Sequence, residues 1–115
     1  MRDYLMVTSD TSTVVTIDTV SHEPIESTSV GDEILCMDGY YFESGALLSV
    51  FGTLKGRIII LIDWDSFPNN FHANGPINCI KITKDGKFMI ATTEAGSIYL
   101  FTEHNESYFN GPPKE

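Results

Sequence analysis

Short apolar runs separated by small turns set the pattern of the chain. One alternating run begins at Ile34 and another at Ile77. A turn follows each of them, at Glu43–Gly45 and at Lys84–Gly86. Apolar positions that alternate with period two predict half-buried β-strands, and no segment has the 3.6-residue period and caps of a helix. The pattern therefore predicts an all-β protein with little helix.

The pattern occurs twice. After the first turn, each copy continues with a second apolar run ("ALLSVFGT" or "KFMIATTE"), a tight turn at Gly56 or Gly96, and a third run ("RIIIL" or "SIYLF"). Val, Ile, Thr, Phe and Tyr dominate these runs, as they do in strands. The Ser-Gly and Asp-Gly turns supply residues with positive φ, which hairpins need. The order strand, turn, strand, turn, strand predicts antiparallel sheets.

The head of the chain fits a partial earlier copy. Residues 4–9 are predicted to form its second strand, residues 10–12 the turn, and residues 13–18 its third strand. The chain then divides into a partial unit (1–30), two fuller units (31–74 and 75–111) and a tail (112–115). A repeat of about 40–45 residues with three or four short strands is typical of a β-propeller blade.

The sequence "GPINCIKITKDGKFMIATTEAGSIYLF" resembles a divergent WD-repeat blade. In that family a His, a Ser or Thr, an Asp and a Trp often form a hydrogen-bonded set that stiffens each blade. His72 stands near the His place, Thr93 near the hydroxyl place and Glu94 near the Asp place. Phe101 and Leu61 occupy the Trp places of the two copies, so the set is incomplete.

The resemblance implies four-stranded antiparallel blades that form part of a WD-repeat-like propeller. Propellers close with about four to eight blades, and an open arc leaves apolar sheet faces that stacked repeats normally cover. We therefore expect either a segment of a longer protein or a ring completed by another chain or copy. The alternative fold is a compact β-sandwich built from the same strands.

The charge of the chain bears on its partners. Sixteen acidic residues against seven basic ones give a net charge of −9, which excludes a surface that tracks phosphates. The one basic group is formed by Lys81, Lys84 and Lys87. We interpret it either as a patch for an acidic protein partner or as a solvated hairpin, and we expect no nucleic-acid binding.

The expected location follows from the apolar runs. None reaches the roughly 18–20 residues that cross a bilayer, and the first residues lack the apolar segment and cleavage site of a secretory signal. We expect an intracellular protein without membrane contact.

The cysteines indicate no metal site. Cys36 and Cys79 occupy equivalent places in the two copies, and neither has a second Cys or a His at ligand spacing. We expect reduced cysteines in the core. The three His lie far apart in the sequence, and no nucleophile motif is present. The sequence thus predicts no catalytic residue, no metal and no cofactor.

The segment "DWDSFPNN" at residues 63–70 is predicted to be a polar loop. Its carboxylates do not form an EF-type calcium loop, because Phe67 and Pro68 stand where an oxygen ligand and a glycine are required. Trp64 and Phe67 are aromatic residues beside charge, and such residues often anchor protein interfaces. We predict that they bind a protein partner.

The resemblance implies a non-catalytic scaffold for protein–protein interactions, which uses loops or a blade edge. Fold alone does not establish function. Two alternatives stay open. One is a propeller enzyme that acts on a small ligand or depends on a metal, and the other is a structural subunit segment of a large complex.

Overall fold

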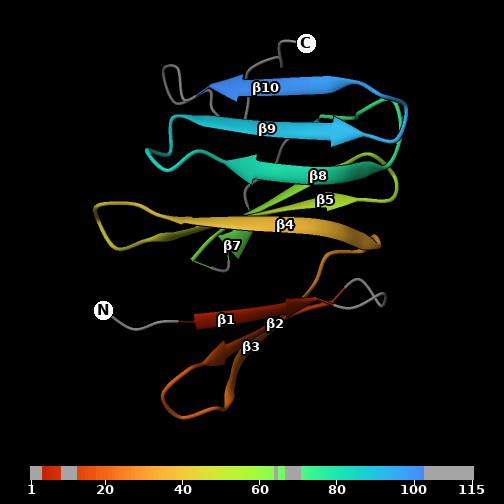
Figure 1. Cartoon of the computed structure of the whole chain (residues 1–115). Coiled ribbons are helices and arrows are strands. Elements are labelled where there is room, and N and C mark those ends of the chain that lie inside the picture. Colours follow the sequence, from red (N-terminus) through yellow and green to blue (C-terminus); the bar gives the residue numbers. More distant parts are fainter. Residues whose placement is uncertain (1–3, 9–12, 64, 67–70, 103–115) are drawn as a thin grey trace.

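The described residues of the chain fold into three antiparallel β-sheets (Figure 1). The computed structural model describes residues 4–8, 13–63, 65–66 and 71–102, and these residues contain no helix. The first sheet contains β1 (Tyr4–Thr8), β2 (Thr13–Asp18) and β3 (Pro24–Ser29). The middle sheet contains β4 (Ile34–Tyr41), β5 (Leu47–Thr53), β6 (Ile58–Ile62) and β7 (Asp65–Ser66). The third contains β8 (Ile77–Ile82), β9 (Phe88–Thr93) and β10 (Ile98–Thr102). The predicted all-β, antiparallel fold is confirmed.

The turns between strands depend on glycine. Gly45, Gly56, Gly86 and Gly96 all have positive φ, between 73° and 93°. The φ values of Gly45 and Gly86 follow the prediction made from the Ser-Gly and Asp-Gly pairs. The amides of Gly45 and Gly86 each close their turn by donating to the carbonyl three residues earlier, at 2.9 Å. A side chain would strain these positions, because L-residues rarely adopt this part of φ/ψ space.

The middle and third sheets repeat the same hydrogen bonds. The N–H of Thr53 donates to the carbonyl of Arg57 at 3.1 Å, and the N–H of Arg57 donates to Oγ1 of Thr53 at 3.0 Å. Thr93 and Ser97 make the same two bonds, at 3.1 and 3.3 Å. The sequence repeat thus corresponds to a structural repeat at the turn that follows β5 or β9.

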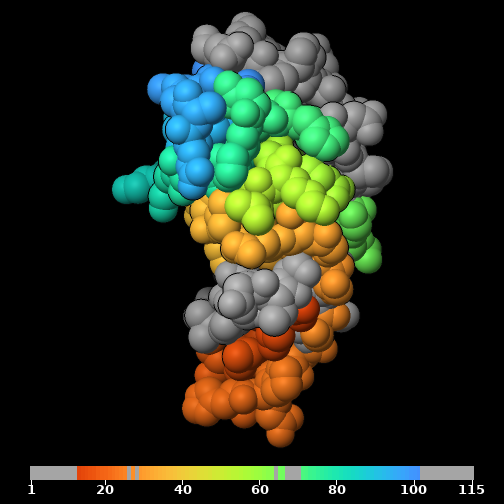
Figure 2. All heavy atoms as spheres, turned by 90° about the vertical axis from the view of Figure 1, so that its right-hand side faces the viewer, coloured from red at the N-terminus to blue at the C-terminus, as the bar shows by residue number. Residues whose placement is uncertain are grey.

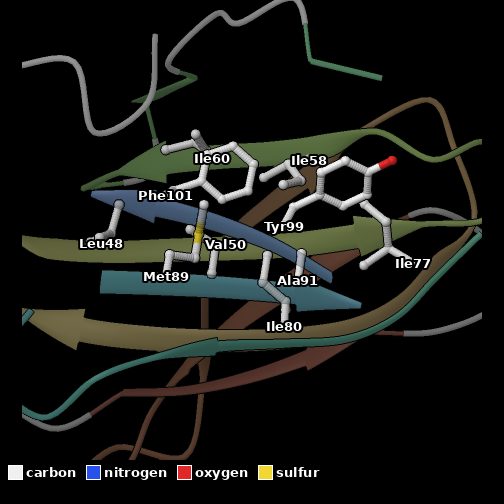
Figure 3. Close-up of a cluster of buried hydrophobic side chains, with 10 residues drawn as sticks. All are labelled: Leu48, Val50, Ile58, Ile60, Ile77, Ile80, Met89, Ala91, Tyr99 and Phe101. Atoms are coloured by element: carbon white, nitrogen blue, oxygen red, sulfur yellow. The ribbon is translucent and has the colours of Figure 1, made fainter. Parts of the chain in front are cut away.

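The three sheets are stacked in chain order along the molecule, whose extents are 42 × 32 × 21 Å (Figures 1 and 2). We call the face that a sheet turns toward the next sheet in chain order its front face, and the opposite one its rear face. The front face of the third sheet is the one that points away from the middle sheet. The front face of the middle sheet and the rear face of the third enclose the larger core cluster (Figure 3). That cluster consists of Leu48, Val50, Ile58, Ile60, Ile77, Ile80, Met89, Ala91, Tyr99 and Phe101.

A smaller cluster joins the first sheet to the middle one. Val14 from β2 packs with Ile34, Phe51 and Leu61 from the rear face of the middle sheet. The middle sheet is therefore covered on both faces, and all seven residues of β5 are buried. Burial on both faces explains why the β5 sequence is a nearly continuous apolar run instead of an alternating one.

The strands differ from the prediction at two places. β3 was not anticipated, because it begins with a proline and is mostly polar. Such a sequence is tolerated in a strand at a sheet edge, and among the described strands β3 pairs with β2 alone. Asp65–Ser66 was predicted to be loop, but it forms the short strand β7, which pairs with Leu61–Ile62 of β6. Asp63 makes the sharp turn between them with a φ of 48°. The predicted turn at residues 10–12 lies outside the described residues.

Candidate functional site

The three basic residues that were predicted as a possible partner-binding patch lie on the third sheet and its first hairpin. Lys81 belongs to β8, and Lys84 and Lys87 lie in the turn between β8 and β9. All three are exposed. The turn thus brings Lys84 and Lys87 together at its tip, while Lys81 stands on the strand, directly opposite Ile90 of β9.

Side-chain hydrogen bonds fix the shape of this turn. Oδ1 of Asp85 accepts from Oγ1 of Thr83 at 2.6 Å and from the N–H of Lys87 at 3.0 Å. These bonds stabilise the carboxylate and lower the pKa of Asp85 below its ordinary value, with the Thr83 hydroxyl as the main cause. The lysines are therefore presented by a defined hairpin.

The same turn rests on the middle sheet. The hydroxyl of Tyr40 donates to the carbonyl of Asp85 at 3.2 Å. A methyl group placed on Gly86 would lie 2.5 Å from the Tyr40 ring, so only glycine fits there without movement. Tyr40 also packs edge-on against Phe42, with ring centroids 5.7 Å apart. The position of the basic turn thus depends on an aromatic pair at the end of β4.

Two polar contacts join β4 to β8 at the centre of the stack. Oδ2 of Asp38 accepts from the N–H of Ile82 at 2.7 Å, and its Oδ1 accepts from the N–H of Gly39 at 2.9 Å. The thiol of Cys36 donates to the carbonyl of Ile77 at 3.5 Å. Burial raises the pKa of Cys36 from 9.0 to about 11, so the thiol stays protonated at neutral pH.

The two cysteines have different environments. Both are free thiols; Cys36 is half-buried between the sheets and Cys79 is exposed. The expectation of a core cysteine was therefore wrong for Cys79. The two residues do occupy equivalent strand positions, but Cys79 lies on the front face of the third sheet, against which no further sheet packs within the described residues.

A network of hydrogen bonds centred on Asn74 links the loop before β8 to the end of β9, the turn after it and β10. Oγ1 of Thr93 donates to Oδ1 of Asn74 at 2.9 Å, and Nδ2 of Asn74 donates to Oγ of Ser97 at 2.5 Å. The N–H of Asn74 donates to the hydroxyl of Tyr99 at 3.3 Å. Thr93, the hydroxyl residue expected here, thus takes part in a network, but Asn74, Ser97 and Tyr99 were not predicted from their positions.

The other two residues expected in this network lie elsewhere. His72 is exposed and forms an isolated antiparallel bridge with Arg57. Glu94 is exposed, and its N–H donates to the carbonyl of Pro76 at 3.0 Å. Asn74, and not His72, is bonded to Thr93, and its amide can both donate and accept. The only signal for it in the sequence was its position in the loop before β8.

The aromatic residues predicted to bind a partner, Trp64 and Phe67, lie outside the described residues. Within the described part of the chain, no group of three or more His, Cys, Asp and Glu side chains could hold a metal ion. His22 lies in the exposed turn between β2 and β3 with a φ of 62°. No helix in the described residues is long and apolar enough to cross a membrane.

Two comparisons with known proteins give no match. Neither a protein-family model nor a curated protein sequence is similar to this chain. Function is therefore inferred from the repeat, the stack of sheets and their exposed surfaces.

Proposed function

We propose that the chain is a non-catalytic scaffold for protein–protein interactions, built as a segment of a WD-repeat-like β-propeller. The observation that supports this proposal best is that both pairs of neighbouring sheets pack in the same sense, over a large cluster between the middle and third sheets and through Val14 between the first and middle ones. The first sheet contacts the middle one, and the middle one contacts the third, each time front face to rear face. Stacked repeats of this kind form rigid platforms that present loops and hairpins.

The basic turn is the surface we assign to a protein partner. Lys84 and Lys87 are exposed at a hairpin that Asp85 and Tyr40 hold in place. A rigid surface loses little conformational entropy when it binds. In a chain with a net charge of −9, this turn offers a local positive surface to an acidic segment of another protein. Trp64 and Phe67 stay predicted as apolar anchors for a partner.

The test begins with identification of a partner. The chain is immobilised, proteins from a cell extract are captured and cross-linked, and a candidate is then purified and titrated against the chain. We expect the double variant Lys84→Glu/Lys87→Glu to bind several-fold more weakly, with the larger difference at low salt, because charges at an interface rim act through long-range attraction. Lys55→Glu changes another exposed lysine and serves as the matched control.

Two outcomes would count against the proposal. If Lys84→Glu/Lys87→Glu and Trp64→Ala/Phe67→Ala both bind every purified candidate as the wild type does, then neither surface is an interaction site. If instead a divalent ion gives a large, saturable increase in melting temperature and no protein binds, the metal-dependent enzyme becomes the better interpretation.

A further inference from the structure

The front face of the third sheet carries an uncovered apolar surface. Phe88, Ile90 and Ile98 are 40%, 38% and 57% exposed. The strand register places Ile98 and Leu100 of β10 on the same face as Ile90 of β9, and Cys79 and Lys81 of β8 on that face as well. We call these residues, together with Thr92, the front patch.

The structural repeat indicates which kind of surface can pack against the front patch. With Thr53 matched to Thr93, Leu48 and Val50 of the middle sheet correspond to Phe88 and Ile90. Leu48 is 1% exposed and Val50 is not exposed at all, because the rear face of the third sheet covers them (Figure 3). Equivalent positions in the third sheet are exposed because, within the described residues, no further sheet lies against them. The fitting occupant is therefore the rear face of another sheet of this repeat.

The charge of Lys81 limits which surface can cover the front patch. Lys81 stands where the middle sheet has Asp38, since the two residues pair with the equivalent Ile90 and Val50. Asp38 accepts a backbone N–H from the sheet that covers it, whereas an ammonium group only donates. A sheet that covers the front patch must therefore offer carboxylates or carbonyls near Lys81. The third sheet, with Lys81, Lys84 and Lys87, is also the most basic part of the chain.

The segment that forms the first sheet is acidic. The sequence contains no Lys or Arg between Arg2 and Lys55, while residues 4–29 contain Asp10, Asp18, Glu23 and Glu26. On its rear face β2 presents Val15 and Ile17, which correspond to Ile59 and Leu61 of the middle sheet at the spacing of 44 residues. Ser27 of β3 lies opposite Val15 and is exposed. The rear face thus presents half-buried apolar residues, while Asp18 is buried with Val14 and Thr16 on the front face.

We propose that the front patch binds the rear face of the first sheet of a second copy of this chain, head to tail. The inference rests on the proposed propeller and names its partner. The described residues of two copies form six sheets, a number within the range of about four to eight blades in closed propellers, whereas those of three copies exceed it. If the rotation between the two copies closes the assembly, the head-to-tail contact gives a ring in which the same interface, or joint, occurs twice.

A symmetric contact between two front patches fits the structure less well. It would place Lys81 of one copy near Lys81 of the other in a desolvated joint, and like charges there are costly. Both internal joints of the stack are also front to rear. The head-to-tail arrangement repeats these joints and pairs the basic third sheet with the acidic first sheet.

Light scattering on a sizing column tests the association over a range of concentrations. We expect the wild type to have twice the monomer mass of 12.8 kDa and Ile90→Glu to have the monomer mass, because it places an unpaired charge in an apolar joint. Ile98→Glu is a second variant at a more exposed position. Leu54→Glu, at an exposed leucine outside the front patch, should keep the wild-type mass. Circular dichroism confirms that each variant is folded.

Mixing variants tests the direction of the joint. Ser27→Arg alters the rear face of the first sheet and should also give monomers. An equimolar mixture of Ile90→Glu and Ser27→Arg should again form dimers at high concentration, because each variant keeps the face that the other has lost. A symmetric contact predicts instead that Ser27→Arg stays dimeric by itself, and that result overturns the head-to-tail proposal.

A wild-type chain that stays at 12.8 kDa at all concentrations also overturns it, as does a dimer that survives both Ile90→Glu and Ile98→Glu. The proposed scaffold function fails separately. A monomer that binds a purified protein partner through the basic turn keeps that function and refutes only the second-copy inference. A dimer that binds no protein partner does the reverse.

Discussion

Asn74 organises the turn before β8 through three hydrogen bonds, to Thr93, Ser97 and Tyr99. Thr93 is only 4% exposed, so loss of its acceptor leaves a buried hydroxyl with fewer partners. We expect Asn74→Ala to lower the free energy of unfolding by about 1–3 kcal/mol. Denaturant titration measures this loss.

Asn78→Ala is the matched control for Asn74→Ala. Oδ1 of Asn78 accepts from Oγ1 of Thr92 at 2.6 Å, but this pair is exposed to water, which replaces the lost bond at little cost. Equal losses in the two variants would show that the Asn74 network has no special structural part.

Burial of the Cys36 thiol gives a pH-dependent prediction. Only the thiolate reacts rapidly with iodoacetamide, and the pKa of Cys36 is raised to about 11. In a Cys79→Ser variant, we expect the alkylation rate to be slow at pH 8 and to keep rising toward pH 11. Mass spectrometry follows the reaction. A rate that levels off near pH 9 would mean that the folded protein does not protect this thiol.

The raised pKa of Cys36 also predicts how the stability of the fold changes with pH. The folded state keeps the Cys36 proton between pH 9.0 and about 11, where the unfolded state loses it. The contribution of Cys36 is therefore fully present below pH 9 and is lost as the pH rises through about 11. Cys36→Ala should reduce the fall in stability over this interval, compared with the wild type.

Gly52 shows how closely two strands can approach across the stack. A methyl group there would lie 2.5 Å from Cγ2 of Ile77 and 2.7 Å from Sγ of Cys36. We expect Gly52→Ala to cost about 1–3 kcal/mol of unfolding free energy through overpacking. Gly39→Ala is the matched control in β4, because its nearest neighbour would be the carbonyl of Leu48 at 3.5 Å, an ordinary contact.

The expected result for Gly39→Ala is no loss of stability or a gain of about 0.4–1 kcal/mol, since alanine restricts the unfolded chain. Thermal unfolding of the two variants under one condition gives the comparison. If Gly52→Ala is as stable as Gly39→Ala, the middle and third sheets can separate slightly, and the core of Figure 3 is less tightly packed than described.

The sequence predicted the elements that have strong local signals and missed the others. β5, β6, β9 and β10 combine apolar runs with glycine turns, so they were recognised. β3 has neither signal, since its strand state depends on pairing with β2 and not on its own residues. Local pattern therefore predicts strands, but it does not predict which polar segment completes a sheet.

The candidate site was predictable to a similar extent. Exposure of Lys84 and Lys87 followed from a turn sequence. The exposure of Cys79 did not, because it depends on whether another sheet covers its face. Asn74 was missed because its role depends on contacts with residues about 20 positions away. Interactions across such distances leave little trace in a single sequence.

The stack as a whole is expected to unfold as one unit, because the middle sheet contributes to both core clusters. Phe51→Ala removes a fully buried ring from the smaller cluster, and we expect it to cost about 3–5 kcal/mol. Hydrogen exchange should then become faster in β9 and β10 as well, although neither contributes to that cluster. Faster exchange confined to β1–β3 would show that the sheets unfold separately.

Burial of β5 on both faces also governs which substitutions this protein can tolerate. An ordinary half-buried strand accepts polar residues at every second position, so its mutational profile alternates. β5 has no solvent-facing side, since all seven of its residues are buried. A saturation scan for folded protein should therefore find an unbroken block of intolerant positions from 47 to 53. In β9, where buried and outward positions alternate, the same scan should find tolerance at every second residue in the monomer.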